Sequence, residues 1–131
     1  MQIKDYLNEL LNLFAANPYI KSQNLSFEER PPNAAYFTGT LIFINDSKMH
    51  FKEFVVFKPE SVNILKYGYS YLSEDNTLIF RYDNALDPQA KKFATYPGHK
   101  HTHKDKELLS ALKPAFEQML KEISKIIEIE K

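Results

Sequence analysis

Hydrophobic residues near the start of the chain recur at the spacing of an amphipathic helix. Between Ile3 and Ala16 they stand three or four positions apart, which places them on one helical face. These apolar positions are Leu7, Leu10, Leu11 and Phe14. Asn17 and Pro18 follow and are typical of a helix end. The pattern predicts an N-terminal helix.

From Ile20 onward the pattern changes to short runs of β-branched and aromatic residues that are separated by turn residues. It predicts about five strands. Their expected limits are Ile20 to Glu29, Ala35 to Ile44, Lys48 to Phe57, Val62 to Leu72 and Thr77 to Asn84. The connections are too short for crossover helices, so we expect the strands to pair antiparallel, as a meander.

The segment from Ala85 to Lys104 has little periodicity, holds three of the four histidines, and is expected to form a long loop. A helical stripe of apolar residues then reaches the end of the chain. It consists of Leu108, Leu112, Phe116, Leu120, Ile123 and Ile127. Pro114 should either kink this helix or start a new one after Lys113. The predicted fold class is α+β, with a helix at each end of an antiparallel sheet.

The composition fits a single domain over residues 1–131. A chain of this length, 44% hydrophobic, has enough apolar material for one core. The absence of cysteine excludes disulfides and thiolate sites and suits a reducing compartment. The sequence shows neither signal-peptide features nor an apolar stretch of about 20 residues. We therefore expect a cytoplasmic protein without a membrane partner.

The 17 basic and 17 acidic residues cancel, so only a local patch could attract a nucleic acid. Lysines gather around the predicted loop. They are Lys91, Lys92, Lys100, Lys104 and Lys106. This clustering favours a local anionic ligand, although lysines near a helix start are also often simply solvated.

Strand alternation places one carboxylate on an apolar face. Glu53 shares a side of the third strand with Met49, Phe51 and Val55. A carboxylate in that position is usually near an edge or paired with a cation. Arg81 is the expected partner.

Alternation also aligns Tyr67, Tyr69 and Tyr71 on one face of the fourth strand. Such a row usually packs on a half-buried sheet, but it can also stack unpaired bases. In the fifth strand Arg81 and Asp83 share a face. Asp83 followed by asparagine at a strand exit is also ordinary turn chemistry.

Three histidines stand at alternate positions, His99, His101 and His103, beside a Pro-Gly turn. Such a loop can be merely solvated, but it can also present imidazoles next to the end of the fifth strand. His103, which leads into the lysine-rich segment, is the weakest candidate of the three. The pattern indicates a candidate site in this region.

The run from Leu78 to Ala85, followed by the run from Thr95 to His101, resembles the paired signature of the TumE family of toxin–antitoxin proteins. The family pattern is an Arg-Tyr-Asp-Asn block, then a proline, histidines, a lysine and a further histidine. The segments 49–54 and 67–71 also match its usual layout, so the resemblance covers most of the chain. One departure is clear: where the family often has two adjacent histidines, this chain has Gly98-His99.

The resemblance implies a small toxin that acts as a ribonuclease and is neutralised by a cognate helix-turn-helix antitoxin. RNA is cleaved without metal when a base takes the 2′-hydroxyl proton, an acid protonates the leaving 5′-oxygen and a cation holds the phosphate. Histidine can fill either proton-transfer role near neutral pH. We expect His99 and His101 to transfer protons and Arg81 to hold the phosphate of a single-stranded RNA.

Further residues are expected to assist. Asp83 would orient a histidine, and Glu53 would orient Arg81 or act as the base. The expected substrate-binding residues are Lys100, Tyr69, Tyr71, Tyr82 and Asn84, with Lys100 adding positive charge and the tyrosines stacking bases.

Two other classes of function remain open. In a metal-dependent nuclease or hydrolase, His99 and His101 with Asp83 or Glu53 would bind a divalent ion; otherwise no cofactor is expected. In a non-catalytic binding module, the polar centre would only brace the sheet. The open edge of such a sheet can also pair with a second copy of the chain, which would give a homodimer.

Overall fold

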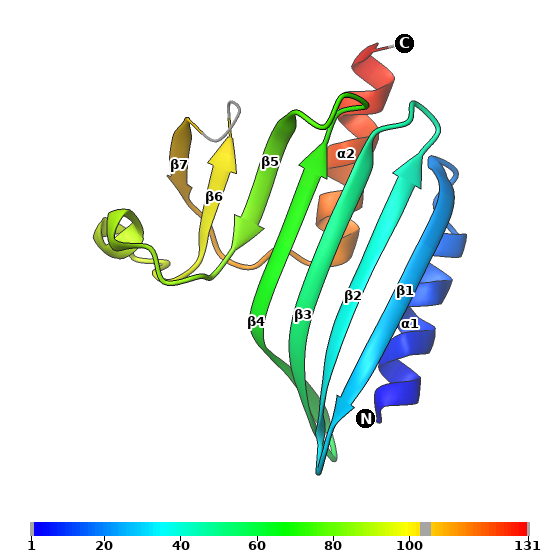
Figure 1. Cartoon of the computed structure of the whole chain (residues 1–131), viewed down its shortest axis with the longest axis vertical. Helices are drawn as coiled ribbons and strands as arrows, with labels where there is room; N and C mark the ends of the chain where they lie inside the picture. Colours follow the sequence, from blue (N-terminus) through cyan, green and yellow to red (C-terminus); the bar gives the residue numbers. More distant parts are fainter. Residues whose placement is uncertain (1, 103–105, 131) are drawn as a thin grey trace.

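The computed structural model describes residues 2–102 and 106–130 of the chain. Within these residues, seven antiparallel strands form one sheet in the order of the sequence, β1 to β7 (Figure 1). The elements are α1 (Ile3–Ala15), β1 (Ile20–Arg30), β2 (Ala34–Phe43), β3 (Lys48–Lys58), β4 (Ser61–Leu72), β5 (Leu78–Asp83), the 3-10 helix η1 (Pro88–Lys92), β6 (His99–Thr102), β7 (Glu107–Ser110) and α2 (Phe116–Glu130). The predicted α+β class and antiparallel sheet are confirmed, with seven strands in place of about five.

Both helices lie on the same face of the sheet (Figure 1). Phe116, at the start of α2, contacts both the other helix and the sheet. Its ring packs edge-on against Phe14 of α1, Phe51 of β3 and Tyr69 of β4, with centroids 5.2–5.5 Å apart. Within the described residues, neither α-helix combines the length and the apolar character that a membrane-spanning segment requires.

The segment that was predicted to be a long loop contains two further strands. β6 pairs with β5, and β7 pairs with β6, so the sheet continues past the last predicted strand. Neither four-residue strand has the alternation of apolar and polar residues that marks a half-buried strand. Their conformation follows from pairing with a formed sheet edge, which sequence pattern alone does not reveal.

The C-terminal helix starts later than the apolar stripe suggested. Leu108 lies in β7, and α2 begins only at Phe116. Proline lacks the backbone N–H that a helix interior requires, and it disfavours the helical conformation for the residue before it. Of the two predicted effects of Pro114, the start of a new helix is therefore confirmed.

Glu53 points toward the helices, and its predicted pairing with Arg81 is wrong. Its carboxylate accepts hydrogen bonds from the hydroxyls of Tyr6 and Tyr69, and the residue is only 1% exposed. Burial raises the pKa of Glu53, while the two tyrosine hydroxyls and the charge of Lys113 oppose that rise. Glu53 is thus a hydrogen-bonded core carboxylate between the sheet and α1.

We expect the free energy of unfolding of the wild type to fall as the pH rises, and we predict that Glu53→Gln abolishes this fall. Because the folded-state pKa of Glu53 is raised, the folded chain keeps this proton at pH values where the unfolded chain has lost it. The stabilisation is complete below the ordinary glutamate pKa of about 4.3 and is lost as the pH rises through the raised value. Urea titrations from about pH 4 to pH 8 should show this decline in the wild type and a flatter profile in the variant.

Two further variants complete that experiment. Glu60→Gln removes an exposed carboxylate and should reproduce the wild-type profile. Glu53→Ala leaves the Tyr6 and Tyr69 hydroxyls without their acceptor, which should lower the free energy of unfolding by about 1–3 kcal/mol for each hydroxyl. Parallel wild-type and Glu53→Gln profiles would contradict the assignment.

Candidate functional site

The face of the sheet that the helices leave open carries two rows of polar residues in register. Cross-strand partners in an antiparallel sheet point to the same face, so each row forms a line of neighbours across the strands. The first row is Thr38, Lys52, Gly68, Asp83 and His99. The second row is Thr40, His50, Ser70, Arg81 and His101. Residues from five strands therefore meet on one surface.

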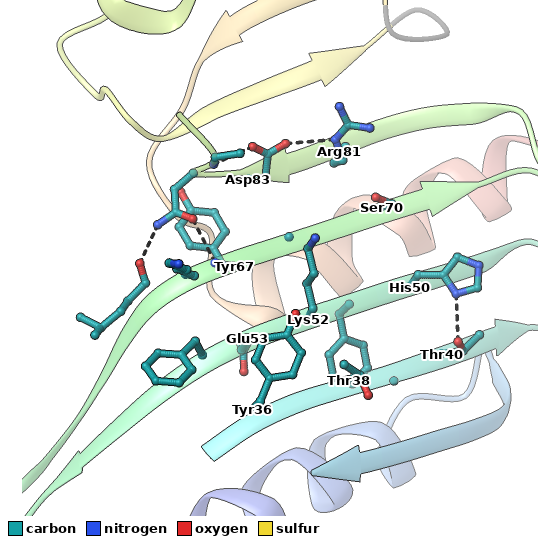
Figure 2. Close-up of a pocket in the computed structure, with 18 of the residues that line it drawn as sticks. Tyr36, Thr38, Thr40, His50, Lys52, Glu53, Tyr67, Ser70, Arg81 and Asp83 are labelled. Atoms are coloured by element: carbon teal, nitrogen blue, oxygen red, sulfur yellow. Dashed lines mark hydrogen bonds and ion pairs between the residues drawn. The ribbon is translucent and has the colours of Figure 1, made fainter. Parts of the chain in front are cut away.

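A groove of about 1240 Å³ lies along this open face (Figure 2). Its lining extends from Ser26 on β1, past Thr38 on β2 and Lys52 on β3, to Arg81 and Asp83 on β5. The groove therefore places residues from five strands against one extended ligand.

Gly68 keeps the floor of the groove open between β3 and β5. A Cβ atom at this position would lie 3.1 Å from Cε of Lys52 and 3.9 Å from Cβ of Asp83. The Lys52 side chain therefore crosses the glycine, and Figure 2 shows it directed from β3 toward β5. The absence of a side chain at residue 68 lets a cation from β3 approach the Asp83 end.

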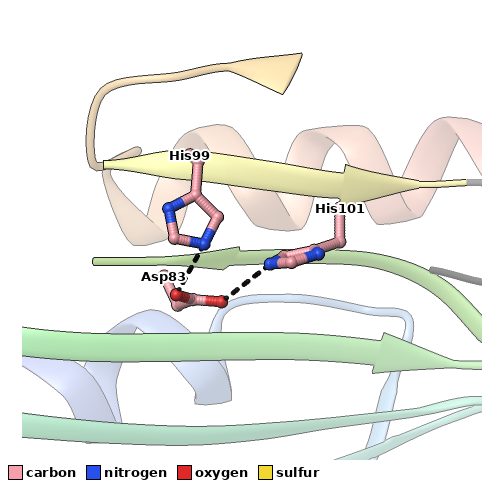
Figure 3. A group of neighbouring side chains, drawn as sticks. All are labelled: Asp83, His99 and His101. Atoms are coloured by element: carbon pink, nitrogen blue, oxygen red, sulfur yellow. Dashed lines mark ion pairs between the residues drawn. The ribbon is translucent and has the colours of Figure 1, made fainter. Parts of the chain in front are cut away.

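Asp83 is the centre of a cluster that we call the Asp83 cluster, formed with Arg81, His99 and His101. Figure 3 shows the two imidazoles of β6 directed toward the Asp83 carboxylate. Its Oδ1 lies 2.9 Å from Nε2 of His99 and accepts a hydrogen bond from the backbone N–H of Ala85 at 3.0 Å. Its Oδ2 accepts from Nε of Arg81 at 3.0 Å and lies 3.4 Å from Nε2 of His101. These donors compensate a carboxylate that is only 7% exposed as a residue.

His99 is held at both ring nitrogens. Nδ1 lies 2.7 Å from the carbonyl oxygen of Pro97, while Nε2 faces Asp83. A carbonyl oxygen and a carboxylate are both hydrogen-bond acceptors, so each ring nitrogen of His99 faces an acceptor. The His99 side chain is 1% exposed, so its contacts are with protein.

The four members of the cluster differ in their access to the groove. Arg81 and Asp83 line it, whereas His99 and His101 lie on β6, next to β5. The side chain of Arg81 is 32% exposed and that of His101 is 12% exposed. The two imidazole rings meet edge to face with centroids 4.8 Å apart. His101 is therefore the more accessible imidazole of the two.

Three residues of the Asp83 cluster form a candidate set of metal ligands. One ligand atom each from Asp83, His99 and His101 can be chosen so that all lie within 4.8 Å of one another. Two imidazoles and one carboxylate suit zinc and related ions, and the contact of His99 with the Pro97 carbonyl resembles the usual support of a metal-binding histidine. Arg81 is the opposing feature, because its guanidinium already binds Oδ2 of Asp83.

Glu53 and Lys100, both predicted site residues, direct their polar groups away from the Asp83 cluster. Glu53 contacts Tyr6 and Tyr69 in the core. Lys100 alternates with His99 and His101 on β6 and so points to the helix-covered face, where its Nζ binds Glu122 of α2 at 2.8 Å. The structure thus contradicts a shared surface for these residues and the Asp83 cluster.

The tyrosines that were predicted to stack bases lie on the helix-covered side of the sheet, Tyr69 and Tyr71 in the core and Tyr82 packed against it. Tyr69 and Tyr71 are fully buried, and the hydroxyl of Tyr82 donates to Glu122. The expected stacking role is wrong for Tyr69 and Tyr71, because a ring beneath the helices cannot meet a base without unfolding. Asn84 binds backbone instead: its side chain accepts from the N–H of Tyr67 and donates to the carbonyl of Leu65.

The structure also explains the departure at Gly98. A Cβ atom there would lie 2.7 Å from the carbonyl oxygen of Ala111 and 3.0 Å from the hydroxyl of Tyr67. A second histidine at this position would therefore require the backbone to move. Burial, and then the nearby charge of Asp83, raise the pKa of that tyrosine, so its hydroxyl stays neutral beneath the cluster. His103 lies outside the described residues.

Sequence reasoning did not select two groove residues, Lys52 and His50. Both face the groove, and Nδ1 of His50 lies 2.9 Å from Oγ1 of Thr40. Alternation along β3 placed both residues opposite Glu53, which was a usable signal. What the sequence did not supply was the register that aligns them with Ser70, Gly68 and β5.

The chain was compared with family models, curated proteins and solved structures. The family model described as "Toxin TumE" matches residues 10–130, which is nearly the whole chain and includes the complete Asp83 cluster. Neither the curated proteins nor the solved structures contain a match. The match includes both halves of the motif that the structure brings together on β5 and β6. The chain therefore belongs to the TumE toxin family.

Proposed function

We propose that this toxin is an endoribonuclease that cleaves single-stranded RNA without a metal ion. The observation that supports this most directly is the Asp83 cluster, which combines two imidazoles, a carboxylate and a guanidinium at one end of a cationic groove. Acid–base groups and a phosphate-binding cation are the parts that metal-free RNA cleavage requires. The chemistry is transesterification by the RNA's own 2′-hydroxyl.

Arg81 is proposed to bind the scissile phosphate. Asp83 holds the Nε atom of Arg81, which fixes the plane of the guanidinium at the groove. A guanidinium fixed in this way can give two parallel hydrogen bonds to phosphate oxygens and stabilise the extra negative charge of the transition state. Lys52, which crosses Gly68 from β3, supplies a second cation on the same surface.

His101 and Asp83 are proposed to carry the proton transfers. His101 is the more exposed imidazole, and its Nε2 lies 3.4 Å from Oδ2 of Asp83, which itself lines the groove. One of the pair takes the 2′-hydroxyl proton, O2′ bonds to phosphorus, and the bond to the 5′-oxygen breaks as that oxygen receives a proton from the other. The products are a 2′,3′-cyclic phosphate and a 5′-hydroxyl.

His99 is proposed to act through Asp83 and not on the substrate. Its buried ring binds Oδ1 of Asp83 and the Pro97 carbonyl at the same time. This arrangement fixes the carboxylate between Arg81 and His101. His99 therefore differs from the sequence-based expectation of two equivalent proton-transfer histidines.

Membership in a toxin family implies an antitoxin partner. We propose that this partner is a helix-turn-helix protein and that the toxin acts in the cytoplasm, where its RNA substrates are found. Pairing of edge strands from two copies would give a homodimer without closing the groove, because β1 and β7 are the outer strands of the sheet.

A metal-dependent phosphodiesterase is the second candidate, and the grouping of Asp83, His99 and His101 favours it. In that case the three side chains would hold a divalent ion that lowers the pKa of a bound water or polarises the phosphate. Arg81 would have to leave Oδ2 of Asp83 or share it with the ion.

We predict that His101→Ala and Arg81→Ala each reduce cleavage of a labelled single-stranded RNA by at least about a hundredfold. Lys100→Ala is the matched control, since this lysine lies between the two histidines in sequence but binds Glu122 on the opposite face. It should retain wild-type cleavage. Circular dichroism of each variant establishes that the fold is intact.

Other results would reject this assignment. Equal cleavage by folded wild type, His101→Ala and Arg81→Ala would exclude the Asp83 cluster as the active site. No cleavage of any single-stranded RNA by the wild type would exclude the ribonuclease and support a binding module.

We predict that EDTA leaves wild-type cleavage unchanged. A metal enzyme would instead lose activity with the chelator and regain it with added Zn²⁺ or Mn²⁺. Calorimetric titration of the wild type and of the His99→Ala variant with Zn²⁺ gives a readout besides activity. Stoichiometric binding by the wild type that His99→Ala abolishes, together with the EDTA effect, would favour the metal-dependent reaction.

A further inference from the structure

The groove runs from the Asp83 cluster across the sheet to a pair of aromatic side chains. Tyr36 of β2 and Phe54 of β3 are direct cross-strand partners, and both line the groove. Each side chain is half-buried, unlike the fully buried tyrosines of β4. Figure 2 shows Tyr36 over the open side of the sheet, with Lys52 between it and the Arg81–Asp83 end.

Register places this pair next to the first polar row. Tyr36 stands two residues from Thr38 on β2, and Phe54 stands two residues from Lys52 on β3, so all four side chains face the groove. Neighbouring strands lie about 4.8 Å apart, so β3 and β2 lie roughly 10–14 Å across the sheet from Asp83 on β5. Gly68, on β4 between them, has no side chain that would rise from the floor of the groove.

The charges that line the groove favour an anion. Its cationic side chains are Lys52, Lys66 and Arg81. Of its two carboxylates, Glu53 is buried on the helix side and Asp83 is compensated by Arg81 and the two histidines. Lys66 is the cross-strand partner of Phe54, so a cation also stands beside the aromatic pair. Rings flanked by cations suit a chain that alternates flat bases with phosphates.

We propose that Tyr36 and Phe54 form a base-stacking platform for single-stranded RNA and that Lys52 binds the phosphate between this platform and the Asp83 cluster. The inference rests on the proposed function for its catalytic end, but it adds a separate binding subsite. Stacking requires an unpaired base, since only an unpaired base can turn its flat face onto a side chain on the sheet. Single-stranded RNA is thus the committed ligand.

The first test compares two substrates. A dinucleotide seated at the Asp83 cluster does not extend to the platform, whereas a longer single-stranded RNA does. Tyr36→Ala and Phe54→Ala should lower kcat/KM for the longer RNA by about tenfold to a hundredfold, the usual effect of losing one stacked base, and leave dinucleotide cleavage unchanged. Tyr36→Phe keeps the ring and should behave as the wild type. An equal loss on both substrates, or no loss on either, would overturn the platform.

Phe27→Ala is the control for loss of an aromatic residue elsewhere. Phe27 is 42% exposed and stacks on Phe37, which belongs to the helix-covered face. This variant should cleave both substrates at wild-type rates. Lys52→Ala should weaken binding of the longer RNA. The affinity of the variant should also depend less on salt concentration, because one phosphate contact has been removed. An unchanged salt dependence would reject the phosphate role of Lys52.

The second test separates the platform from the proposed catalysis. A 2′-deoxy oligonucleotide has no attacking hydroxyl, so its binding can be followed by fluorescence anisotropy without cleavage. Binding that falls about tenfold or more in Tyr36→Ala and Phe54→Ala supports the platform even if the wild type cleaves no RNA. RNA cleavage at the Asp83 cluster, with oligonucleotide binding unchanged in both variants, would overturn the platform and leave the proposed function standing.

Discussion

Both helices occupy one face of the sheet, and this constraint divides the polar residues of the chain into two groups. Successive residues of a strand point to opposite faces, so neighbours in sequence are separated by the thickness of the sheet. Lys52 faces the groove while Glu53 contacts tyrosines in the core. His101 joins the Asp83 cluster while Lys100 binds α2. The side of the sheet on which a side chain lies therefore determines whether it belongs to the core or to the groove.

The Asp83 cluster depends on the short fifth and sixth strands. Register aligns Asp83 with His99 and Arg81 with His101, which brings two sequence motifs that are separated by η1 into contact. A nearly buried carboxylate is costly unless donors surround it, and here every donor other than one backbone N–H is a cationic or ionisable side chain. The same arrangement that stabilises the charge also assembles groups suited to acid–base chemistry.

Periodicity was sufficient to predict both helices, the first five strands and the antiparallel pairing. It was insufficient for β6 and β7, because four-residue strands that form against an existing edge have no distinctive pattern. The apolar stripe from Leu108 predicted too early a start for the C-terminal helix. It continued through Pro114 at helical spacing, although Leu108 belongs to a strand. Local pattern and tertiary pairing disagreed there, and pairing determined the structure.

The candidate site was also predictable only in part, because tertiary structure determines which residues share a surface. Arg81, Asp83, His99 and His101 were selected from residue chemistry and motif resemblance, and the structure brings all four together. The tyrosine row was interpreted correctly as sharing a face, but which face the helices cover is a tertiary property. Tyr69 and Tyr71 are therefore core residues, while the exposed aromatic pair, Tyr36 and Phe54, lies on the other side of the sheet.

Net charge illustrates how the fold creates a local surface that composition conceals. The chain is neutral overall, and the lysines near the predicted loop indicated a patch there. Of these, Lys100 is neutralised by Glu122, whereas the groove cations come from β3, β4 and β5. A neutral protein can thus present a cationic groove. Of the two carboxylates that line this groove, Glu53 is directed into the core and Asp83 is held by internal partners. The attraction of this groove for a phosphate chain comes from that separation of charges and not from an excess of basic residues.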